Sequence, residues 1–361
     1  MTPGTLTTTS TADGSGPAAP RVGVHALEVV LPGLVEPTGL QLRTRELGAP
    51  GRGEVLVAVD ATGVSFAEQA MRRGRDPGQP RFPFVPGYDV VGTVAEVGPG
   101  VDAALVGRRV AALTKTGGWA SHLLLPARDL LPVPGGLDPA EVETLVVNGI
   151  TAWQMLHRTA QVQPGQVVLV HGANGGVGTT LAQLARHHGV RVIGAAHPRH
   201  HATLRLLGVE PVDYADPVAM DARVRELAPG GVDAVFDNVG GPTLLRSWAL
   251  LAPGGSLVSC SIASVTGNLV WAFLRLLVRL AVWDLAPNGR SAGFYDIWAG
   301  HRTRPHTFRA HLRTDLAAVL DLLAAGVLVP QIAARVPLAE AARGLALAEA
   351  RTEVGKVVLV P

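Results

Sequence analysis

The pattern of apolar and polar residues changes after Pro139. Before it, from Arg21 to about Val133, short β-like runs are broken by Gly and Pro. Strands at this spacing predict a small, barrel-like β domain. After Pro139, helical stretches alternate with wholly apolar strands, which is the pattern of a parallel sheet buried on both faces. The β-like runs of the first part are Glu54–Val59, Val90–Val97 and Arg109–Leu113.

The second pattern predicts a doubly wound α/β sheet, in which helices cover both faces of parallel strands. Helical stretches such as Thr179–His188 and Thr243–Leu251 separate its strands. The strands are expected at Val167–His171, Val190–Gly194, Val232–Phe236 and Ser256–Cys260.

The C-terminal segment reads as two amphipathic helices, Asp315–Ala325 and Leu338–Glu349, followed by a strand at Lys356–Val360. We expect this last strand to return to the β-rich domain. The predicted organisation is therefore a disordered tail at residues 1–20, a β-rich domain formed by residues 21–148 and 299–361, and a nucleotide-binding domain at residues 149–298.

The apolar stretch Gly267–Ala286 approaches the length of a membrane span. Arg275 and Arg279 argue against a span, because they lie one turn apart on a single helical face and make the helix amphipathic. We favour a lid or dimer-contact helix beside a cleft that takes a bulky lipophilic substrate. A membrane-surface helix and plain core packing are the alternatives.

Composition narrows the class of protein. A chain of 361 residues with 47% hydrophobic residues is long enough for two domains with large cores. The net charge is only +2, and no basic run with interleaved aromatics is present, so nucleic acid is not an expected partner. Cys260 is the only cysteine, which excludes intrachain disulfides and zinc sites built on several thiolates and favours a reducing cytoplasm. The first twenty residues have no basic start and no apolar core, unlike a signal peptide.

A glycine-rich turn carries the strongest chemical signal. An apolar strand precedes Ala173-x-Gly175-x-x-Gly178, and a helix follows directly. Small residues let the backbone turn tightly and approach a pyrophosphate, which the N–H groups of the helix N-terminus then bind. The alternative is a glycine-rich turn without a ligand. The predicted cofactor-binding residues here are Ala173, Asn174, Gly175, Gly176, Val177 and Gly178.

The end of the second strand predicts which dinucleotide binds. NAD-binding units place an acid there to hold the ribose 2′-OH. This chain instead has His197, Arg199, His200 and His201, with no carboxylate among residues 193–201. Cationic groups suit a 2′-phosphate, so we predict NADPH, bound by His197, Arg199 and His200. A solvated surface loop is the alternative interpretation.

With these residues the chain resembles the zinc-independent, quinone oxidoreductase-like branch of the medium-chain dehydrogenase/reductase superfamily, including the relatives of vesicle amine transport protein. The resemblance runs from about Glu54 to Pro361 and rests on seven motifs in the family's order. They are Gly63-Val64-Ser65-Phe66, Pro86-Gly87-Tyr88-Asp89-Val90-Val91-Gly92, Gly117-Gly118-Trp119-Ala120, Thr151-Ala152-Trp153-Gln154-Met155-Leu156, the segment 170–178, Phe236-Asp237-Asn238-Val239-Gly240-Gly241, and Gly355-Lys356-Val357-Val358-Leu359.

The resemblance implies a GroES-like catalytic domain joined to a Rossmann domain, with the active site in the cleft between them. It places Tyr214 and Arg351 with the 197–201 loop around the 2′-phosphate. Members of the family reduce quinones, enones and other activated double bonds with NADPH, usually as homodimers. The residues implied beside the nicotinamide are Asn148, Thr151, Asn238, Val239 and Gly240.

Two departures from the family pattern concern the substrate side. Ser65 stands where many relatives have Asn, and Arg75-Asp76-Pro77 stands where relatives have Leu-Tyr-Pro. An amide and an aromatic ring are therefore missing, which argues against a flat quinone. The zinc ligands of the related alcohol dehydrogenases, a Cys near position 65 and a Gly-His-Glu in place of Gly87-Tyr88-Asp89, are also missing, so no metal is predicted.

Without a Lewis acid, hydride delivery to an activated C=C bond is the favoured chemistry. The enolate that results needs hydrogen-bond donors, and Tyr88, Asp89, Ser65 and Glu68 are the candidate catalytic residues. Each also has a structural interpretation, Tyr88 as a packed aromatic and the two acids as partners of an arginine. Trp119 either packs over the substrate or fills the β domain.

Two further alternatives concern the function as a whole. Simple reduction and reductive cyclisation in secondary metabolism both fit the residues. A different class of protein is an NADPH-binding module with a membrane or protein partner and little catalysis.

Overall fold

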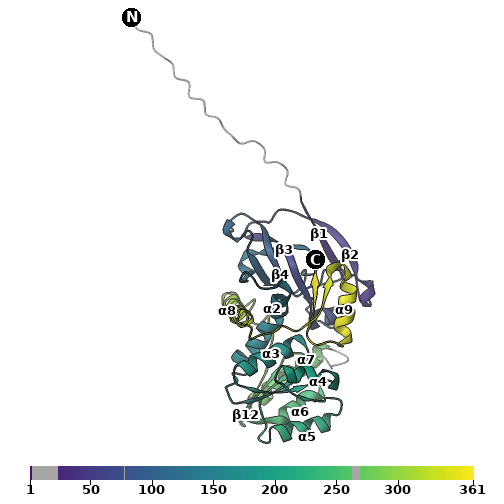
Figure 1. Ribbon diagram of the computed structural model, residues 1–361, viewed down its shortest axis with the longest axis vertical. Coiled ribbons are helices and arrows are strands. Elements are labelled where there is room, and N and C mark those ends of the chain that lie inside the picture. The colour runs from purple at the N-terminus through teal and green to yellow at the C-terminus, as the bar shows by residue number, and fades with distance from the viewer. Residues whose placement is uncertain (2–22, 77, 262–268) are drawn as a thin grey trace.

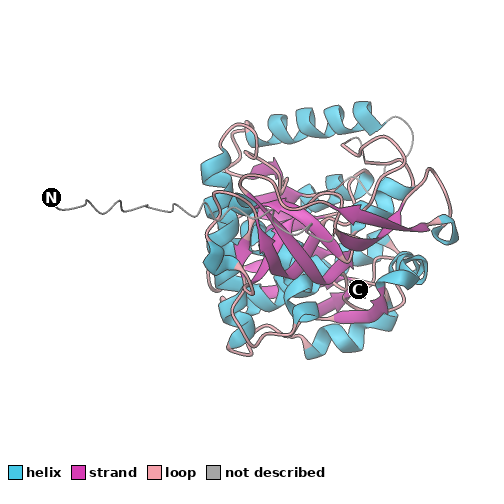
Figure 2. Cartoon of the chain, turned by 90° about the horizontal axis from the view of Figure 1, so that it is seen from above, coloured by secondary structure: helices cyan, strands magenta, loops and turns pink. Residues whose placement is uncertain are grey.

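The computed structural model describes residues 1, 23–76, 78–261 and 269–361. Apart from Met1, the predicted tail lies outside the described residues. Two large sheets dominate the described part, a mixed sheet near the chain's C-terminus and a parallel sheet at the opposite end (Figure 1). Seen from above, strands lie centrally and helices surround them (Figure 2). The architecture is the predicted α/β class, a GroES-like β-rich part beside a Rossmann sheet.

The β-rich part contains a two-stranded antiparallel pair and a seven-stranded sheet of order β14-β15-β3-β4-β5-β7, with β6 paired to β3. The predicted return of the C-terminal strand is confirmed, because β15 pairs antiparallel with β3 and aligns Val358 with Gly63. The strands are β1 (Val24–Val30), β2 (Gln41–Leu47), β3 (Glu54–Val64), β4 (Asp89–Val97), β5 (Arg109–Leu113), β6 (His122–Pro126), β7 (Leu131–Pro132), β14 (Ile332–Pro337) and β15 (Lys356–Val360).

The Rossmann sheet has six parallel strands in the order β10-β9-β8-β11-β12-β13. Numbered within the sheet this is 3-2-1-4-5-6, so the strand order reverses between β8 and β11 and opens a crevice at their carboxyl ends. The predicted doubly wound sheet is confirmed. Its strands are β8 (Val167–His171), β9 (Arg191–Ala195), β10 (Glu210–Val212), β11 (Val232–Asp237), β12 (Leu251–Ser259) and β13 (Ser291–Phe294).

Helix α2 (Pro139–Trp153) connects the two sheets. Asp138 caps its N-terminus by accepting from the N–H groups of Ala140 and Glu141, and Pro139 occupies the first helical position. The helix packs against α3 of the Rossmann part and against β3 and β4 of the β-rich part. Since it is buried on almost all sides, α2 holds both parts in a fixed relation to the crevice.

The remaining helices cover the sheets, and several differ from the predicted bounds. The helix predicted from Thr179 begins at Gly176, the one predicted from Asp315 begins at Pro305, and the strand predicted from Ser256 begins at Leu251. The segment Leu338–Glu340 forms a 3₁₀ turn before α9. The helices are α1 (Phe66–Arg72), α3 (Gly176–His187), α4 (His201–Leu206), α5 (Pro217–Leu227), α6 (Pro242–Leu250), α8 (Pro305–Ala324) and α9 (Ala341–Ala350).

The predicted helix at 267–286 is α7 (Leu269–Asp284), and residues 267 and 268 lie outside the described part. Its inner face is anchored by Phe273, whose ring lies 5.0 Å from that of Phe294, and by Trp283, which stacks on Trp248 at 4.7 Å. The opposite face exposes large apolar side chains to solvent, among them Leu274, Leu277, Val278 and Val282.

No helix in the described part of the chain is long and apolar enough to cross a membrane.

Candidate active site

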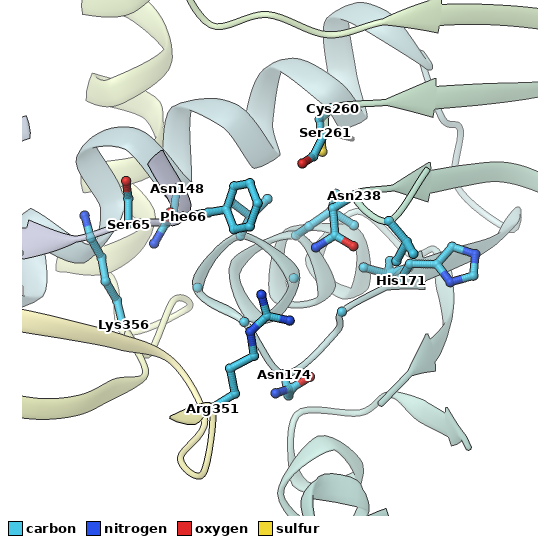
Figure 3. A pocket seen from close by; sticks show the side chains of 18 of the residues that line it. Ser65, Phe66, Asn148, His171, Asn174, Asn238, Cys260, Ser261, Arg351 and Lys356 are labelled. Atoms are coloured by element: carbon cyan, nitrogen blue, oxygen red, sulfur yellow. The ribbon is translucent and has the colours of Figure 1, made fainter. Parts of the chain in front are cut away.

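A cavity of about 900 Å³ lies where the crevice of the Rossmann sheet faces the β-rich part. His171 and Asn238 line it at the ends of β8 and β11, and Ser65 and Lys356 line it from the β-rich part (Figure 3). The position agrees with the rule that open α/β sheets bind ligands at the switch point of strand order.

The glycine-rich turn forms one wall of this cavity. Gly172 has φ +63°, and a Cβ on Gly178 would lie 2.4 Å from the Gly172 carbonyl oxygen, so both positions require glycine. Gly175 is the N-cap of α3 and supplies no capping side chain. The first N–H groups of this helix therefore have no side-chain acceptor, which suits an anionic ligand.

The turn also contacts the C-terminal strand segment. The Gly355 N–H donates to the Asn174 carbonyl at 3.0 Å. A Cβ on Gly355, at φ +104°, would lie 1.9 Å from the Gln331 carbonyl oxygen. This close approach brings Arg351 and Glu353, which come just before Gly355, into the wall of the same cavity.

Two amides pack on glycines of the turn. A Cβ on Gly176 would lie 2.2 Å from Asn148 Nδ2, and one on Gly172 would lie 2.7 Å from Asn238 Nδ2. Both amides line the cavity, together with Thr151. Asn148, Thr151 and Asn238, which the family resemblance implies beside the nicotinamide, thus line one space, although Asn148 and Asn238 lie 90 residues apart in the printed sequence.

Arginines supply the positive charge at the far end of the cavity. Arg199 and Arg351 both line it, and Arg351 takes a left-handed conformation at the end of α9 with φ +50°. Burial, with help from Arg199 and His197, lowers the pKa of His200. His200 is therefore neutral at neutral pH rather than one of the cations that the sequence indicated.

Two predicted cofactor residues lie behind the wall. Ala173 is fully buried, and the Gly240 N–H donates to Asp237 Oδ1 at 2.8 Å within a turn. Both shape the backbone that the ligand would touch. The predicted cofactor residues that do line the cavity are Asn148, Thr151, Asn174, Gly175, Gly176, Val177, Gly178, His197, Arg199, His200, Tyr214, Asn238, Val239 and Arg351.

Ser65 and Glu68 form a helix cap. The Ser65 hydroxyl donates to Glu68 Oε2 and accepts from the Ala67 N–H at 3.1 Å. Glu68 also accepts from the Tyr88 N–H at 2.7 Å, and burial raises the pKa of Glu68. Ser65 lines the cavity but Glu68 does not. The hydrogen bonds of this pair therefore stabilise the start of α1 and the position of Tyr88, and they leave neither side chain as a donor to a substrate.

Asp89 belongs to a buried charge cluster. Lys356 Nζ lies 2.9 Å from Asp89 Oδ2 and 2.5 Å from Glu143 Oε1, and all three side chains are at most 2% exposed. The Val147 N–H also donates to Asp89, at 3.1 Å. Asp89 is thus a structural partner, as one of the sequence interpretations held, but of a lysine instead of an arginine.

Tyr88 has the geometry of a hydrogen-bond donor. Its hydroxyl accepts from Trp298 Nε1 at 2.6 Å, and no acceptor for its own proton occurs within the described residues. Burial raises the pKa of Tyr88, which keeps the phenol protonated. Tyr88 lines the cavity, as does Phe66, whose ring projects into the space (Figure 3).

Trp119 fills the β domain, since it is fully buried and donates from Nε1 to the Gly63 carbonyl at 2.8 Å. The cavity wall also includes four residues that the sequence did not indicate as site residues, Phe66, Cys260, Ser261 and Tyr295. Three of these follow directly after β12 or β13, so a correct assignment of both strand ends would have indicated them.

Among the residues that the structure describes, no group of three or more His, Cys, Asp or Glu side chains is arranged to hold a metal ion.

Comparison with known proteins gives two family matches. The alcohol dehydrogenase GroES-like domain matches residues 51–135, and the family described as zinc-binding dehydrogenase matches residues 207–359. Together they cover strands of both sheets.

Individual proteins are similar over nearly the whole chain. The 2-haloacrylate reductase of a Burkholderia species is 33% identical over 326 residues, which cover 88% of this chain and 93% of that protein. The human synaptic vesicle membrane protein VAT-1 homolog is 32% identical over 332 residues, which cover 89% and 82%. The solved structure of mycobacterial Rv1454c complexed with NADPH aligns with a TM-score of 0.79 at 31% identity, covering 93% of this chain and 100% of that one.

Proposed function

The chain belongs to the medium-chain dehydrogenase/reductase superfamily, in its zinc-independent quinone oxidoreductase-like branch, and on this premise we propose that it is an NADPH-dependent reductase of activated C=C bonds. The observation that carries the proposal is the composition of the wall of this cavity. The N-terminus of α3, which has no capping side chain, contributes to this wall together with Arg199 and Arg351, and Tyr88 contributes to it from the β-rich part.

The residues present fit NADPH. The first N–H groups of α3 would bind the pyrophosphate, and Arg199 and Arg351 the 2′-phosphate. Asn148, Thr151 and Asn238 would hold the nicotinamide end. NADPH bound in this way supplies a hydride to the substrate. The mycobacterial relative solved with NADPH supports this choice of cofactor.

Tyr88 would bind the carbonyl oxygen of the substrate. As the β-carbon of an unsaturated carbonyl compound accepts hydride, negative charge develops on that oxygen, and a positioned phenol O–H stabilises it more than it stabilises the neutral substrate. The Trp298 indole fixes the phenol by donating to its oxygen, so that the proton points away from Trp298.

The substrate side favours a lipophilic compound. Phe66, Met155, Phe294 and Ile297 contribute apolar surface to the wall there. One relative is named 2-haloacrylate reductase, and 2-haloacrylate is a small compound with an activated C=C bond. The name supports the proposed type of bond, but it refers to a smaller molecule.

Oxidation of NADPH, followed by absorbance with a panel of 2-haloacrylates, enones, polyenes and quinones, tests the proposal. Turnover of an enone, polyene or haloacrylate that exceeds turnover of quinones supports it, and mass spectrometry of the product separates simple reduction from cyclisation. Tight NADPH binding with no turnover of any of them would overturn the reductase proposal and favour a binding module.

We also infer a homodimer. Among the described strands β13 is at the edge of the Rossmann sheet and pairs only with β12. The exposed apolar face of α7 lies on the helix that packs against β13. An open strand edge beside an exposed apolar helix face is a surface that a second copy would cover.

A further inference from the structure

A second cavity opens at the surface where the C-terminal ends of α2 and α3 meet the second half of α8. Its volume is about 350 Å³, within the range of sites that bind small molecules. It shares no lining residue with the cavity described above. The residues that line it are Trp153, His157, Leu184, His187, His188, Ala318, Asp321 and Leu322.

Helix α3 separates the two cavities. Its N-terminal turn borders the first one, and Leu184 and His187 near its other end border the second. The helix has 12 residues, and at a rise of about 1.5 Å per residue its ends lie about 18 Å apart. A molecule in the second cavity therefore occupies a separate site from a ligand at the glycine-rich turn.

Aromatic rings form one side of the second cavity. The rings of Trp153 and His157 lie 4.4 Å apart, and those of His157 and His188 lie 5.0 Å apart at 90° to each other. Burial, followed by the neighbouring His188, lowers the pKa of His157. This imidazole is therefore neutral at neutral pH and can accept a hydrogen bond. Leucine and alanine side chains complete the apolar part of the wall.

The charge on this wall is negative. Asp321 is its only carboxylate among the described residues, and no described side chain pairs with it. The two arginines next to wall histidines in the sequence are engaged elsewhere, since Arg158 pairs with Asp315 at 2.5 Å and Arg186 packs on Gly208. The C-terminal end of α3 adds the partial negative charge of its backbone carbonyl groups. The site is therefore suited to a cation.

We propose that the second cavity is a binding site for a small primary ammonium compound with an aromatic body. The ammonium group would pair with Asp321 and donate to His157, and Trp153 would contact the cation through its ring. A carboxylate compound would be repelled by Asp321 and by the end of α3. A neutral alcohol would leave the charge of Asp321 without a partner. The inference does not depend on the proposed reductase function.

Calorimetry with the full-length protein at pH 7.5 tests the inference. The three probes are 2-phenylethylammonium, 2-phenylethanol and 3-phenylpropanoate, which share a ring and differ in the charge of the end group. We expect the ammonium compound to bind about 5-fold more tightly than the alcohol, as expected for an ion pair at a partly exposed site, and the carboxylate to bind most weakly. Added NADPH should not compete with the ammonium compound, because the two cavities share no residue.

Two variants test the location of the site. Asp321→Asn removes the charge and keeps the shape, so the ammonium compound and the alcohol should bind within about 2-fold of each other. Ala318→Phe fills the cavity and should weaken binding of the ammonium compound by more than about 10-fold, because the added ring occupies the space of the ligand. Ala317→Phe is the matched control, since it adds the same ring at an exposed position of α8 outside the cavity wall and should bind as the wild type does.

The outcomes separate clearly, with the folding of each variant checked by circular dichroism. Preferential binding of the ammonium compound that is lost in Asp321→Asn and Ala318→Phe and kept in Ala317→Phe supports the inference. It is overturned if the wild-type protein binds none of the probes or all three equally, or if the preference survives in either Asp321→Asn or Ala318→Phe. Competition by NADPH would place the ammonium compound in the first cavity and would also overturn it. None of these results bears on the proposed function, which NADPH turnover tests separately.

Discussion

At the scale of single residues, the proposed chemistry depends most directly on the Tyr88 hydroxyl. Tyr88→Phe keeps the ring and removes a hydroxyl whose proton has no acceptor among the described residues. We expect kcat with an enone to fall about 100-fold, the usual effect of losing one oxyanion donor, and the dissociation constant for NADPH to stay unchanged. Stopped-flow hydride transfer and NADPH titration measure the two effects.

The control for Tyr88 is Trp298→Phe, which removes the indole donor and leaves the phenol. It should lower kcat only a few-fold. Because burial raises the pKa of Tyr88, the phenol stays protonated, and we expect no loss of activity through this group between about pH 7 and pH 9. A kcat for Tyr88→Phe within threefold of the wild type would show that another group donates the hydrogen bond to the substrate oxygen.

The charges at the far end of the cavity give a second prediction at this scale. Arg199→Ala and Arg351→Ala should each weaken NADPH binding by about 10- to 100-fold, as expected for a charged hydrogen bond to phosphate, and leave NADH binding unchanged. Arg205→Ala, on α4 outside the cavity wall, is the control. Equal losses for NADPH and NADH would contradict the assignment of the 2′-phosphate site.

At the scale of elements, the charge cluster joins α2, β4 and β15. Two carboxylates share the Lys356 ammonium, and Glu143 Oε2 has no hydrogen-bond partner in the described structure. Burial and the nearby Asp89 raise the pKa of Glu143 well above its usual value. Glu143 is therefore a carboxyl that binds a proton more readily in the folded than in the unfolded chain.

This assignment predicts how stability depends on pH. Because the pKa of Glu143 is higher in the folded than in the unfolded chain, the folded protein binds more protons above about pH 4.5, and the free energy of unfolding falls as pH rises from there. Glu143→Gln imitates the protonated form and should remove that fall. Urea unfolding from about pH 5 to pH 8 measures it, and identical slopes for the two proteins would refute the assignment.

The main elements could be predicted because their sequence patterns are local. Val167–His171 and Lys356–Val360 are short apolar runs with sharp ends, and both form the predicted strands. The start of α3 was placed three residues late, since Gly176 and Gly178 are poor helix formers and take helical geometry because Asn148 and the Gly172 turn pack on them. β13 was missed because Ser291–Phe294 is short and contains a glycine.

The site was less predictable because its contacts are distant in sequence. Asp89 and Lys356 are 267 positions apart, and nothing near Asp89 indicates that its partner is a lysine. Tyr88 and Asp89 are neighbours whose side chains serve different purposes, the first on the cavity wall and the second beneath α2. Periodicity could show that one of them faces inward, but only the packing of α2 and β15 decides which.

At the scale of the whole molecule, α7 is unusual because one of its faces exposes several large apolar side chains to solvent. Its inner face already packs on the Rossmann part through Phe273 and Trp283. Its outer face still exposes 45% of Leu274 and 63% of Val278. An anchored helix with an exposed apolar face of this kind is typical of an interaction surface. The open edge of β13 beside it makes a second copy of the chain the occupant that we infer.

The oligomeric state tests this inference. We expect the wild-type protein to be a dimer by light scattering at micromolar concentration, and the double variant Leu274→Glu/Val278→Glu to be a folded monomer, because two carboxylates on each copy would meet across a two-fold contact. Leu206→Glu changes an equally apolar residue that is 83% exposed on α4 and should leave the dimer intact. A monomeric wild type that floats with liposomes would contradict the dimer and favour a membrane-surface role for the same face, because lipid would then be the apolar phase that covers it.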